Sequence, residues 1–223
     1  MTARTLLITL AGPQQAWGSR SRFATRDTER APTRSGVVGL VAAAMGLERT
    51  DPLDRFAALR FGVRIDRPGR VERDFQTART LDGKTSMPLS HRRYLADAVF
   101  LAGLESDDPA LLDEIQSALR RPRYPLYLGR RAFPPAGPIR TELVSTSLRD
   151  ALRDAPVRGT GNGTAGALEL IVDAEPGEEP DLTLDDIPVS FDPRRRRYAR
   201  RDVRILSAPH RESDGTSESG GAS

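Results

Sequence analysis

Apolar side chains recur along this chain with two different periods. Alternation with polar residues and β-branched apolar runs are both typical of strands. They predict strands at residues 5–11, 60–66, 71–77, 92–104, 168–172 and 198–206, and a short edge strand at 189–191. Spacing of three and four residues predicts helices at 36–45 and 110–120, with shorter helices after Asp51 and from 147 to 154.

Residues that begin and end helices support the two longer helices. Thr33 or Ser35 can cap the start of the first, and Gly46 can end it in a left-handed conformation. Asp108 followed by Pro109 is typical of a helix start and precedes the second helix. Both helices are therefore expected to be firm elements of the fold.

The order of these elements predicts an α+β fold. The simplest arrangement is a ferredoxin-like β-α-β-β-α-β core, in which helices cover one face of an antiparallel sheet and insertions decorate it. Strands 60–66 and 71–77 are expected to form a hairpin, and the polar residues 78–91 to leave the sheet. Residues 1–210 are expected to form one domain, with a flexible loop at 159–166 and a disordered tail at 211–223.

Composition excludes several classes of chemistry. The 223 residues include no cysteine, which excludes disulfides and thiol catalysis and suits a cytoplasmic protein. No run approaches the roughly 20 apolar residues of a membrane span, and the first residues lack a signal-peptide cleavage pattern. With only His91 and His210 available, we expect no metal site, no cofactor and no membrane association.

Charge is unevenly distributed, although the net charge is only +3. Residues 1–168 hold 26 basic and 18 acidic residues, a net of +8, and residues 193–211 hold eight basic and one acidic, a net of +7. Between them, residues 169–192 hold nine acidic residues and no basic one. This acidic, proline-containing run is expected to be a solvated loop that faces away from any polyanion, whereas the basic parts suit nucleic acid.

The loop that precedes the first helix is too long for a simple connector. It contains Trp17, which is either a core anchor or a platform for stacking, and five arginines lie at positions 20, 22, 26, 30 and 34. Backbone amides at the helix start near Ser35 and Gly36 are a ready site for an anion beside Arg34.

A second stretch, 124–131, interleaves tyrosines and arginines around a glycine, which favours contact with single-stranded RNA.

Two further stretches leave alternatives open. His91, with Lys84 upstream, fits a metal-independent ribonuclease site in which they serve as acid and base. Arg194–Arg197 form a basic turn that is either a solvated hairpin tip or a contact to phosphate.

Three motifs resemble the CasD family, the subunit that binds the RNA handle in the type I-E CRISPR surveillance complex called Cascade. The first reads LAGPxQAWG at residues 10–18, continues with Thr25-Arg26 and ends with PTRSG at 32–36. The second, PRYxxYLGRR, occupies residues 122–131, and a third fragment, RYLxDA, occupies residues 93–98. Residues 132–192 depart most from the family pattern.

The resemblance implies a ferredoxin-like fold of the repeat-associated (RAMP) type, with a protruding β-hairpin thumb at about residues 75–93. It also implies a non-catalytic RNA-binding protein that caps the 5′ handle of the CRISPR RNA. Partners would be the backbone and large subunits of Cascade, with target DNA met only through the assembled complex. By matching motif, the expected RNA or partner contacts are Gln15, Trp17, Arg26, Arg34, Ser35, Arg92, Arg93, Tyr127, Gly129, Arg130 and Arg131.

Overall fold

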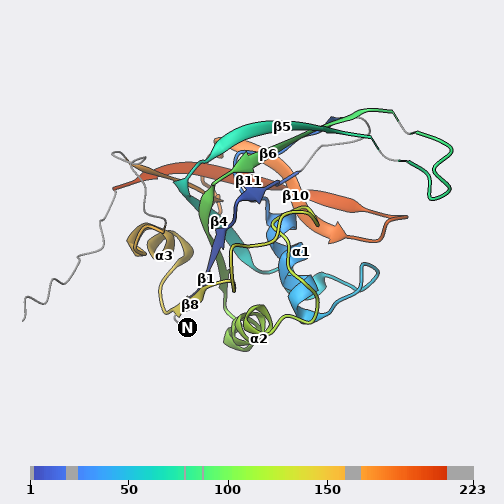
Figure 1. Ribbon diagram of the computed structural model, residues 1–223. Coiled ribbons are helices and arrows are strands. Elements are labelled where there is room, and N and C mark those ends of the chain that lie inside the picture. Colours follow the sequence, from blue (N-terminus) through green and yellow to red (C-terminus); the bar gives the residue numbers. More distant parts are fainter. Residues whose placement is uncertain (1–2, 19–24, 78, 87, 159–166, 210–223) are drawn as a thin grey trace, which may run out of the picture.

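The computed structural model describes residues 3–18, 25–77, 79–86, 88–158 and 167–209. Its strands are β1 (Arg4–Ala11), β2 (Gln14–Gln15), β3 (Thr25–Arg26), β4 (Arg60–Arg67), β5 (Arg70–Gln76), β6 (Ser90–Ala96), β7 (Val99–Ser106), β8 (Thr141–Val144), β9 (Leu168–Asp173), β10 (Leu182–Ser190) and β11 (Arg197–Ala208). Its helices are α1 (Arg34–Met45), α2 (Pro109–Arg120) and α3 (Leu148–Asp154), with one 3-10 turn at Asp54–Phe56 (Figure 1). The predicted loop at 159–166 and tail at 211–223 lie outside the described residues.

The larger sheet contains the ferredoxin-like core. Its strand order is β10-β11-β9-β4-β7-β1-β8, and all neighbouring strands run antiparallel. Within it, the four strands β8-β1-β7-β4 have the order 4-1-3-2 of a β-α-β-β-α-β unit. The predicted α+β class and core are therefore confirmed, and β9, β11 and β10 widen the sheet beyond β4.

The expectation that helices cover one face of this sheet holds for α1 and α2 of the core, but α3 covers the opposite face (Figure 1). The apolar sides of α1 and α2 share one core cluster with Leu6, Ile8 and Leu10 of β1, whereas α3 packs with Leu7 on the other face. Gly62 and Gly103 stand opposite each other in β4 and β7, and a Cβ at either would lie within 3 Å of a leucine of α3. These glycines let α3 lie directly on the sheet.

The helix boundaries follow the expected caps. Thr33 caps α1 by accepting a hydrogen bond from the Gly36 amide, and Gly46 ends it with a φ of 80°. Asp108 caps α2 by accepting from the amides of Ala110 and Leu111. The helix expected after Asp51 is wrong, since only a single 3-10 turn forms there.

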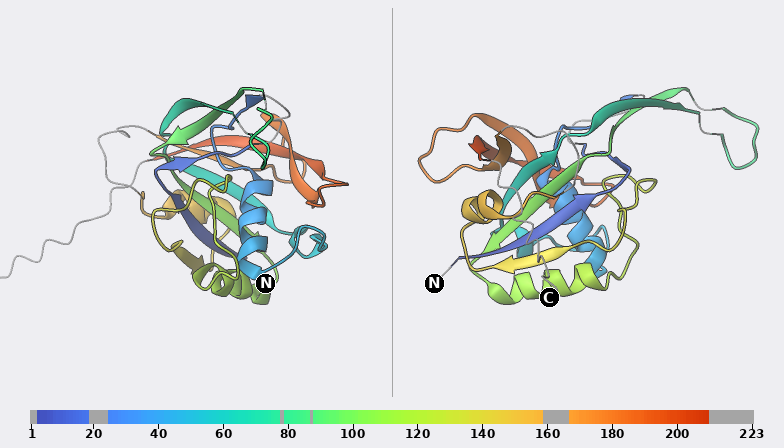
Figure 2. Two further views of the ribbon diagram at one scale, coloured as in Figure 1. Left: turned by 45° about the vertical axis from the view of Figure 1, so that its right-hand side comes forward. Right: turned by 60° about the vertical axis from the view of Figure 1, so that its left-hand side comes forward.

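The predicted hairpin of 60–66 with 71–77 is wrong. β4 pairs with β7 and β9 in the larger sheet, whereas β5 pairs with β6 along its whole length in a second, smaller sheet. The strand expected over 92–104 is divided at Asp97, whose φ of 57° separates β6 from β7. The result is a long β5–β6 hairpin that projects from the body of the molecule, visible in Figure 1 and the right-hand view of Figure 2.

The acidic run is not the solvated loop that its composition predicts. Residues 182–190 form β10, an edge strand of nine residues that pairs with β11. Within this run Asp173 is 9% exposed and Asp186 is fully buried. Two carboxylates of the acidic run thus belong to the interior.

Candidate nucleic-acid interface

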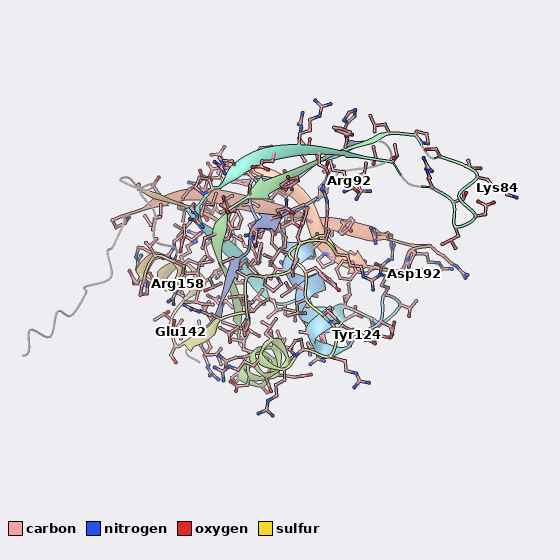
Figure 3. The ribbon with its side chains drawn as sticks, viewed as in Figure 1. Lys84, Arg92, Tyr124, Glu142, Arg158 and Asp192 are labelled. Carbon is pink, nitrogen blue, oxygen red and sulfur yellow. The ribbon has the colours of Figure 1, made fainter. Side chains whose placement is uncertain are left out.

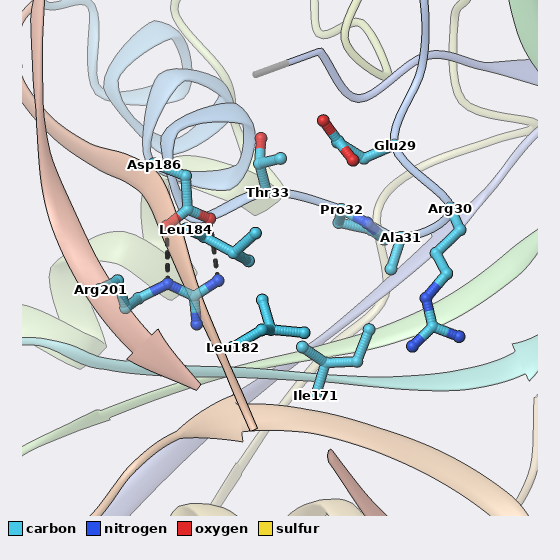
Figure 4. Close-up of a pocket in the computed structure, with 10 residues that line it drawn as sticks. All are labelled: Glu29, Arg30, Ala31, Pro32, Thr33, Ile171, Leu182, Leu184, Asp186 and Arg201. Carbon is cyan, nitrogen blue, oxygen red and sulfur yellow. Dashed lines mark hydrogen bonds and ion pairs between the residues drawn. The ribbon is translucent and has the colours of Figure 1, made fainter. Parts of the chain in front are cut away.

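The start of α1 is occupied by the protein's own carboxylate. The backbone amide of Arg34 donates to Oδ2 of Asp186 at 2.8 Å, and Asp186 comes from β10, 152 residues away. Arg201 of β11 donates to both oxygens of Asp186, at 2.7 and 2.8 Å, and to Asp173 at 2.8 Å. The anion site expected at this helix start is therefore filled from within the chain by Asp186, whose hydrogen bonds with Arg201 are drawn in Figure 4.

The side chain of Arg34 is buried in the same cluster, which we call the buried arginine cluster (Arg34, Asp173, Asp186 and Arg201). Its guanidinium donates to the carbonyls of Phe56 and Ala57 and lies 3.5 Å from Asp173. Burial lowers the pKa of Arg34, partly offset by the charge of Asp173. Burial also opposes the charge on Arg201, but the hydrogen bonds and charges of Asp186 and Asp173 raise its pKa overall.

Gln15 and Trp17 are also interior residues. Gln15 is fully buried, donates to the carbonyls of Leu10 and Ala98, and accepts from the indole of Trp17 at 3.1 Å. Trp17 is 1% exposed and packs on α1, where a Cβ at Gly36 would lie 2.7 Å from its ring. The structure thus decides between the two roles considered for Trp17 in favour of packing.

The expectation that Gln15, Trp17, Arg34 and Ser35 contact RNA is corrected by their burial. Ser35 is 8% exposed and its hydroxyl lies 3.4 Å from that of Thr33. A side chain enclosed by protein on all sides has no surface left for a ligand. These residues instead hold the loop of the first motif against β1, β7 and α1.

The second motif packs directly against the first. The amide of Ala16 donates to the carbonyl of Leu128 at 3.1 Å. Gly129 adopts a φ of 88°, and a Cβ there would lie 1.7 Å from the carbonyl oxygen of Ala16, so only glycine fits. Gly129 therefore serves the contact between the two motifs.

The beginning of the second motif closes the end of α1. The amides of Arg123 and Tyr124 donate to the carbonyls of Ala44 and Ala43, which satisfies acceptors that a helix end leaves free. Tyr124 also donates from its hydroxyl to Glu48 at 2.9 Å. The motif at 122–131 thus bridges α1 and the loop after β1.

Three distant segments meet at an exposed surface, where the motifs end. Arg93 of β6 pairs with Oδ2 of Asp27 at 3.2 Å, and both side chains are about half exposed, 52% and 51%. Arg130 donates to the carbonyl of the same Asp27 at 3.3 Å. Arg131 follows Arg130 and is exposed. We call Asp27, Arg93, Arg130 and Arg131 the Asp27 surface.

A pair of aromatic rings, Tyr94 and Phe133, packs beside Arg130 of the Asp27 surface. The rings of Tyr94 and Phe133 lie 5.5 Å apart, and the guanidinium of Arg130 lies 5.7 Å from the Phe133 ring. Tyr94 donates to Glu72 at 3.0 Å, and this hydrogen bond raises the pKa of the Tyr94 hydroxyl. Arg130 is therefore positioned by stacking as well as by its hydrogen bond.

The remaining predicted residues lie beside these segments. Arg92 and Tyr127 are partly exposed, and Arg92 lies partway along the β5–β6 hairpin, opposite Asp74 (Figure 3). Arg26 pairs through its backbone with Arg92, because β3 runs parallel to β6. Arg20 and Arg22 lie outside the described residues.

Sequence reasoning missed Asp27, Phe133 and the buried arginine cluster. No local pattern marks Asp27, since its partners are 66 and 103 residues away. The run of carboxylates from 173 to 186 did carry a signal, because buried arginines such as Arg34 and Arg201 need acidic partners.

No metal or membrane feature emerges from the described residues. Within the ranges that the structure describes, no group of three or more histidine, aspartate or glutamate residues is arranged to hold a metal ion. Among those same residues, no helix combines the length and apolar character needed to cross a membrane.

Comparison with known proteins identifies the class. A family model described as CRISPR-associated protein (Cas_Cas5) matches residues 5–204. This chain belongs to that family, the Cas5 or CasD proteins. A curated relative is the CRISPR system Cascade subunit CasD of Escherichia coli (strain K12), 37% identical over 153 residues that cover 60% of this chain and 68% of the relative.

Two solved structures agree with this assignment. One, described as a CRISPR RNA-guided surveillance complex, contains a chain that is 36% identical with a TM-score of 0.74, over 92% of this chain and 90% of that one. The other, described as a Cas protein, is 41% identical with a TM-score of 0.75, over 92% of this chain and 95% of that one.

Proposed function

We propose that this protein is a non-catalytic, RNA-binding subunit of a CRISPR Cascade complex that holds the 5′ handle of the CRISPR RNA. It contributes in this way to antiviral defence in the cytoplasm. Membership in the family and the likeness to CasD support the Cascade assignment. Target DNA reaches this subunit through the assembled complex.

The observation that carries RNA binding is the Asp27 surface. Its guanidiniums come from two segments, Arg93 from β6 and Arg130 and Arg131 from the end of the second motif, and Arg93 and Arg130 both contact Asp27 of a third segment. An ion pair as exposed as Arg93 with Asp27 contributes little to stability, and Arg93 can exchange its carboxylate for a phosphate at small cost. Partly exposed Tyr127 adds a ring on which a base can stack.

The β5–β6 hairpin suits a protein partner and takes the role of the thumb. Val71 and Phe75 are 66% and 67% exposed and lie four positions apart on β5, hence on one face. Leu81 and Leu89, in the loop that joins β5 to β6, are also exposed. Exposed apolar residues gathered on a projecting element mark protein contacts, and we assign this one to the backbone subunit. The large subunit then contacts another face of the body.

Replacement of Arg130 and Arg131 by alanine tests RNA binding. The variant should bind handle RNA more weakly, and the slope of log affinity against log salt should become shallower by about 1.4, which corresponds to two lost phosphate contacts on a single strand. The matched control replaces Arg49 and Arg121, two exposed arginines outside the Asp27 surface. An unchanged salt slope in the first variant would remove both arginines from the interface.

A metal-independent ribonuclease is the alternative that the same chain must be tested against. Nδ1 of His91 lies 3.1 Å from a guanidinium nitrogen of Arg73, and Lys84 lies on the far end of the hairpin (Figure 3). An acid and a base acting on one phosphate must be close together, so this placement favours binding over cleavage. Incubation of the protein with repeat RNA in EDTA decides: specific cleavage that is lost in His91→Ala would refute the non-catalytic function.

A further inference from the structure

The tip of the β10–β11 hairpin is a second basic surface that the proposed handle site does not use. Residues 194–197 are four consecutive arginines, three in the turn after β10 and Arg197 at the start of β11, and all four are exposed. Tyr198 and Arg200 follow on β11, 37% and 84% exposed. We call residues 194–200 the basic tip.

The charges of the basic tip are not neutralised by the protein itself. The side chains of Arg194 to Arg197 form no hydrogen bond or ion pair with any other residue that the structure describes. Asp192, the nearest carboxylate in sequence, accepts from the Arg194 amide at 2.8 Å and so shapes the turn. Only Arg200 has an acidic neighbour, Asp185, at 3.7 Å. Several arginines of the body, by contrast, have carboxylate partners, among them Arg60, Arg64 and Arg149.

The hairpin that carries the tip is firmly anchored. Arg201 directly follows the basic tip and belongs to the buried arginine cluster, where it holds Asp186 of the facing strand. At the other side of the turn, Phe191 packs on α1, where a Cβ at Gly39 would lie 3.6 Å from its ring. The exposed arginines are thus presented by a two-stranded ribbon whose base is fixed, which reduces the entropy lost on binding.

We propose that the basic tip binds the phosphate backbone of double-stranded DNA without reading its sequence. Duplex DNA has about one charge per 1.7 Å of helix axis, so adjacent guanidiniums can each meet a phosphate. A two-stranded ribbon also fits the major groove of B-form DNA, whereas that of A-form RNA is too narrow. This inference is independent of handle binding.

Single strands and proteins fit the tip less well. Binding of a single strand depends on successive aromatic platforms, and Tyr198 is the one aromatic side chain among residues 194–200. A protein interface has an apolar centre, but Val189 and Tyr198 are the large apolar side chains exposed near the tip among the described residues. Dense, unpaired positive charge on a narrow ribbon therefore points to a duplex.

The test uses charge reversal in the complete Cascade complex assembled on its CRISPR RNA. The tip variant carries Arg195→Glu and Arg196→Glu, and the control carries Arg49→Glu and Arg121→Glu, an equal change in net charge. Affinity for a 30-base-pair duplex without a match to the guide, and for each of its single strands, is measured across a salt series. The amount of CRISPR RNA in each purified complex reports handle binding separately.

We expect the tip variant to lose at least about tenfold in duplex affinity near 0.1 M salt, with a salt slope shallower by about two. The control should change duplex affinity by less than about twofold, and both should retain their CRISPR RNA. Equal losses in both variants, no loss in the tip variant, or a loss confined to single strands would each overturn the proposal. Failure of the tip variant to join the complex would assign the tip to an acidic protein surface instead, and Arg195→Gln with Arg196→Gln checks that folding is not the cause.

Discussion

The buried arginine cluster and the Asp27 surface use the same chemistry for opposite purposes. In the cluster, Arg34 and Arg201 are 5% and 4% exposed; Arg201 donates to Asp173 and Asp186, and Arg34 lies 3.5 Å from Asp173. On the Asp27 surface, Arg93 pairs with one half-exposed carboxylate and Arg131 is exposed. Arg34 and Arg131 both belong to family motifs, so membership in a motif does not distinguish a packing residue from a contact residue. The two kinds of residue are distinguished by their burial and by the number of carboxylates beside them.

The largest expected effect comes from breaking the buried cluster. Asp186→Ala leaves the start of α1 without its acceptor and removes one of the two carboxylate partners of Arg201, and should lower the free energy of unfolding by about 3–5 kcal/mol. The control is Asp185→Ala, the neighbouring exposed aspartate, which should cost less than about 1 kcal/mol. Urea denaturation measures both, and similar losses in the two variants would contradict the distinction.

The contact between the two motifs should be the next most sensitive. Gly129→Ala forces a side chain into a left-handed conformation and against the Ala16 carbonyl, so we expect a loss of at least about 1–3 kcal/mol. Gly137→Ala is the control, because a Cβ there meets nothing within 4 Å. Thermal unfolding compares the two. If the Gly129 variant were as stable as the control, the motifs would not be held together at this point.

Removal of an exposed arginine should act on binding instead of stability. Arg93→Ala should weaken binding of handle RNA about fivefold, or about 1 kcal/mol, through one lost charge-assisted hydrogen bond. Its thermal unfolding midpoint should stay close to that of the unmodified protein, because the pair with Asp27 is half exposed. A variant that lost stability but kept its RNA affinity would show that Arg93 stabilises the fold and does not contact RNA.

The ion pair between Glu178 and Arg149, which is partly exposed, should give the smallest effect on stability, and only at acidic pH. The hydrogen bond from Arg149, then that from the Glu175 amide, lowers the pKa of Glu178 from 4.5 to about 2. Because the folded pKa is below the unfolded one, the contribution to stability is complete above pH 4.5 and is lost as pH falls toward 2. Glu178→Gln should therefore flatten the decline in stability below pH 4.5. An unaltered decline would show that other carboxylates control it.

Sequence patterns were most informative where the determinants are local. The caps Thr33 and Asp108 and the end at Gly46 were readable because each acts within one helical turn. The motifs also located the Asp27 surface through Arg93, Arg130 and Arg131. The motifs did not separate these surface arginines from the buried residues Gln15, Trp17 and Arg34, because a sequence motif does not show which side chains are exposed.

Strand pairing was less predictable, because it depends on contacts far apart in the chain. The alternation at 60–66 and 71–77 identified two strands, but not that Asp97 would divide the following strand and give β5 a different partner. Likewise, the acidic run looked solvated until Asp186 was found beside Arg34, 152 residues earlier.

The sequence by itself determined the three helices, most of the strands, the α+β class and the family, because periodicity, capping and motif spacing are local properties, but it did not reveal β8, the fourth strand of the core. Tertiary structure alone decided which arginines are free. The guanidiniums of Arg34 and Arg201 are committed because folding brings Asp173 and Asp186 to them, and burying a charge is tolerated only beside such partners. Those of Arg131 and the basic tip stay in water, where a phosphate can reach them.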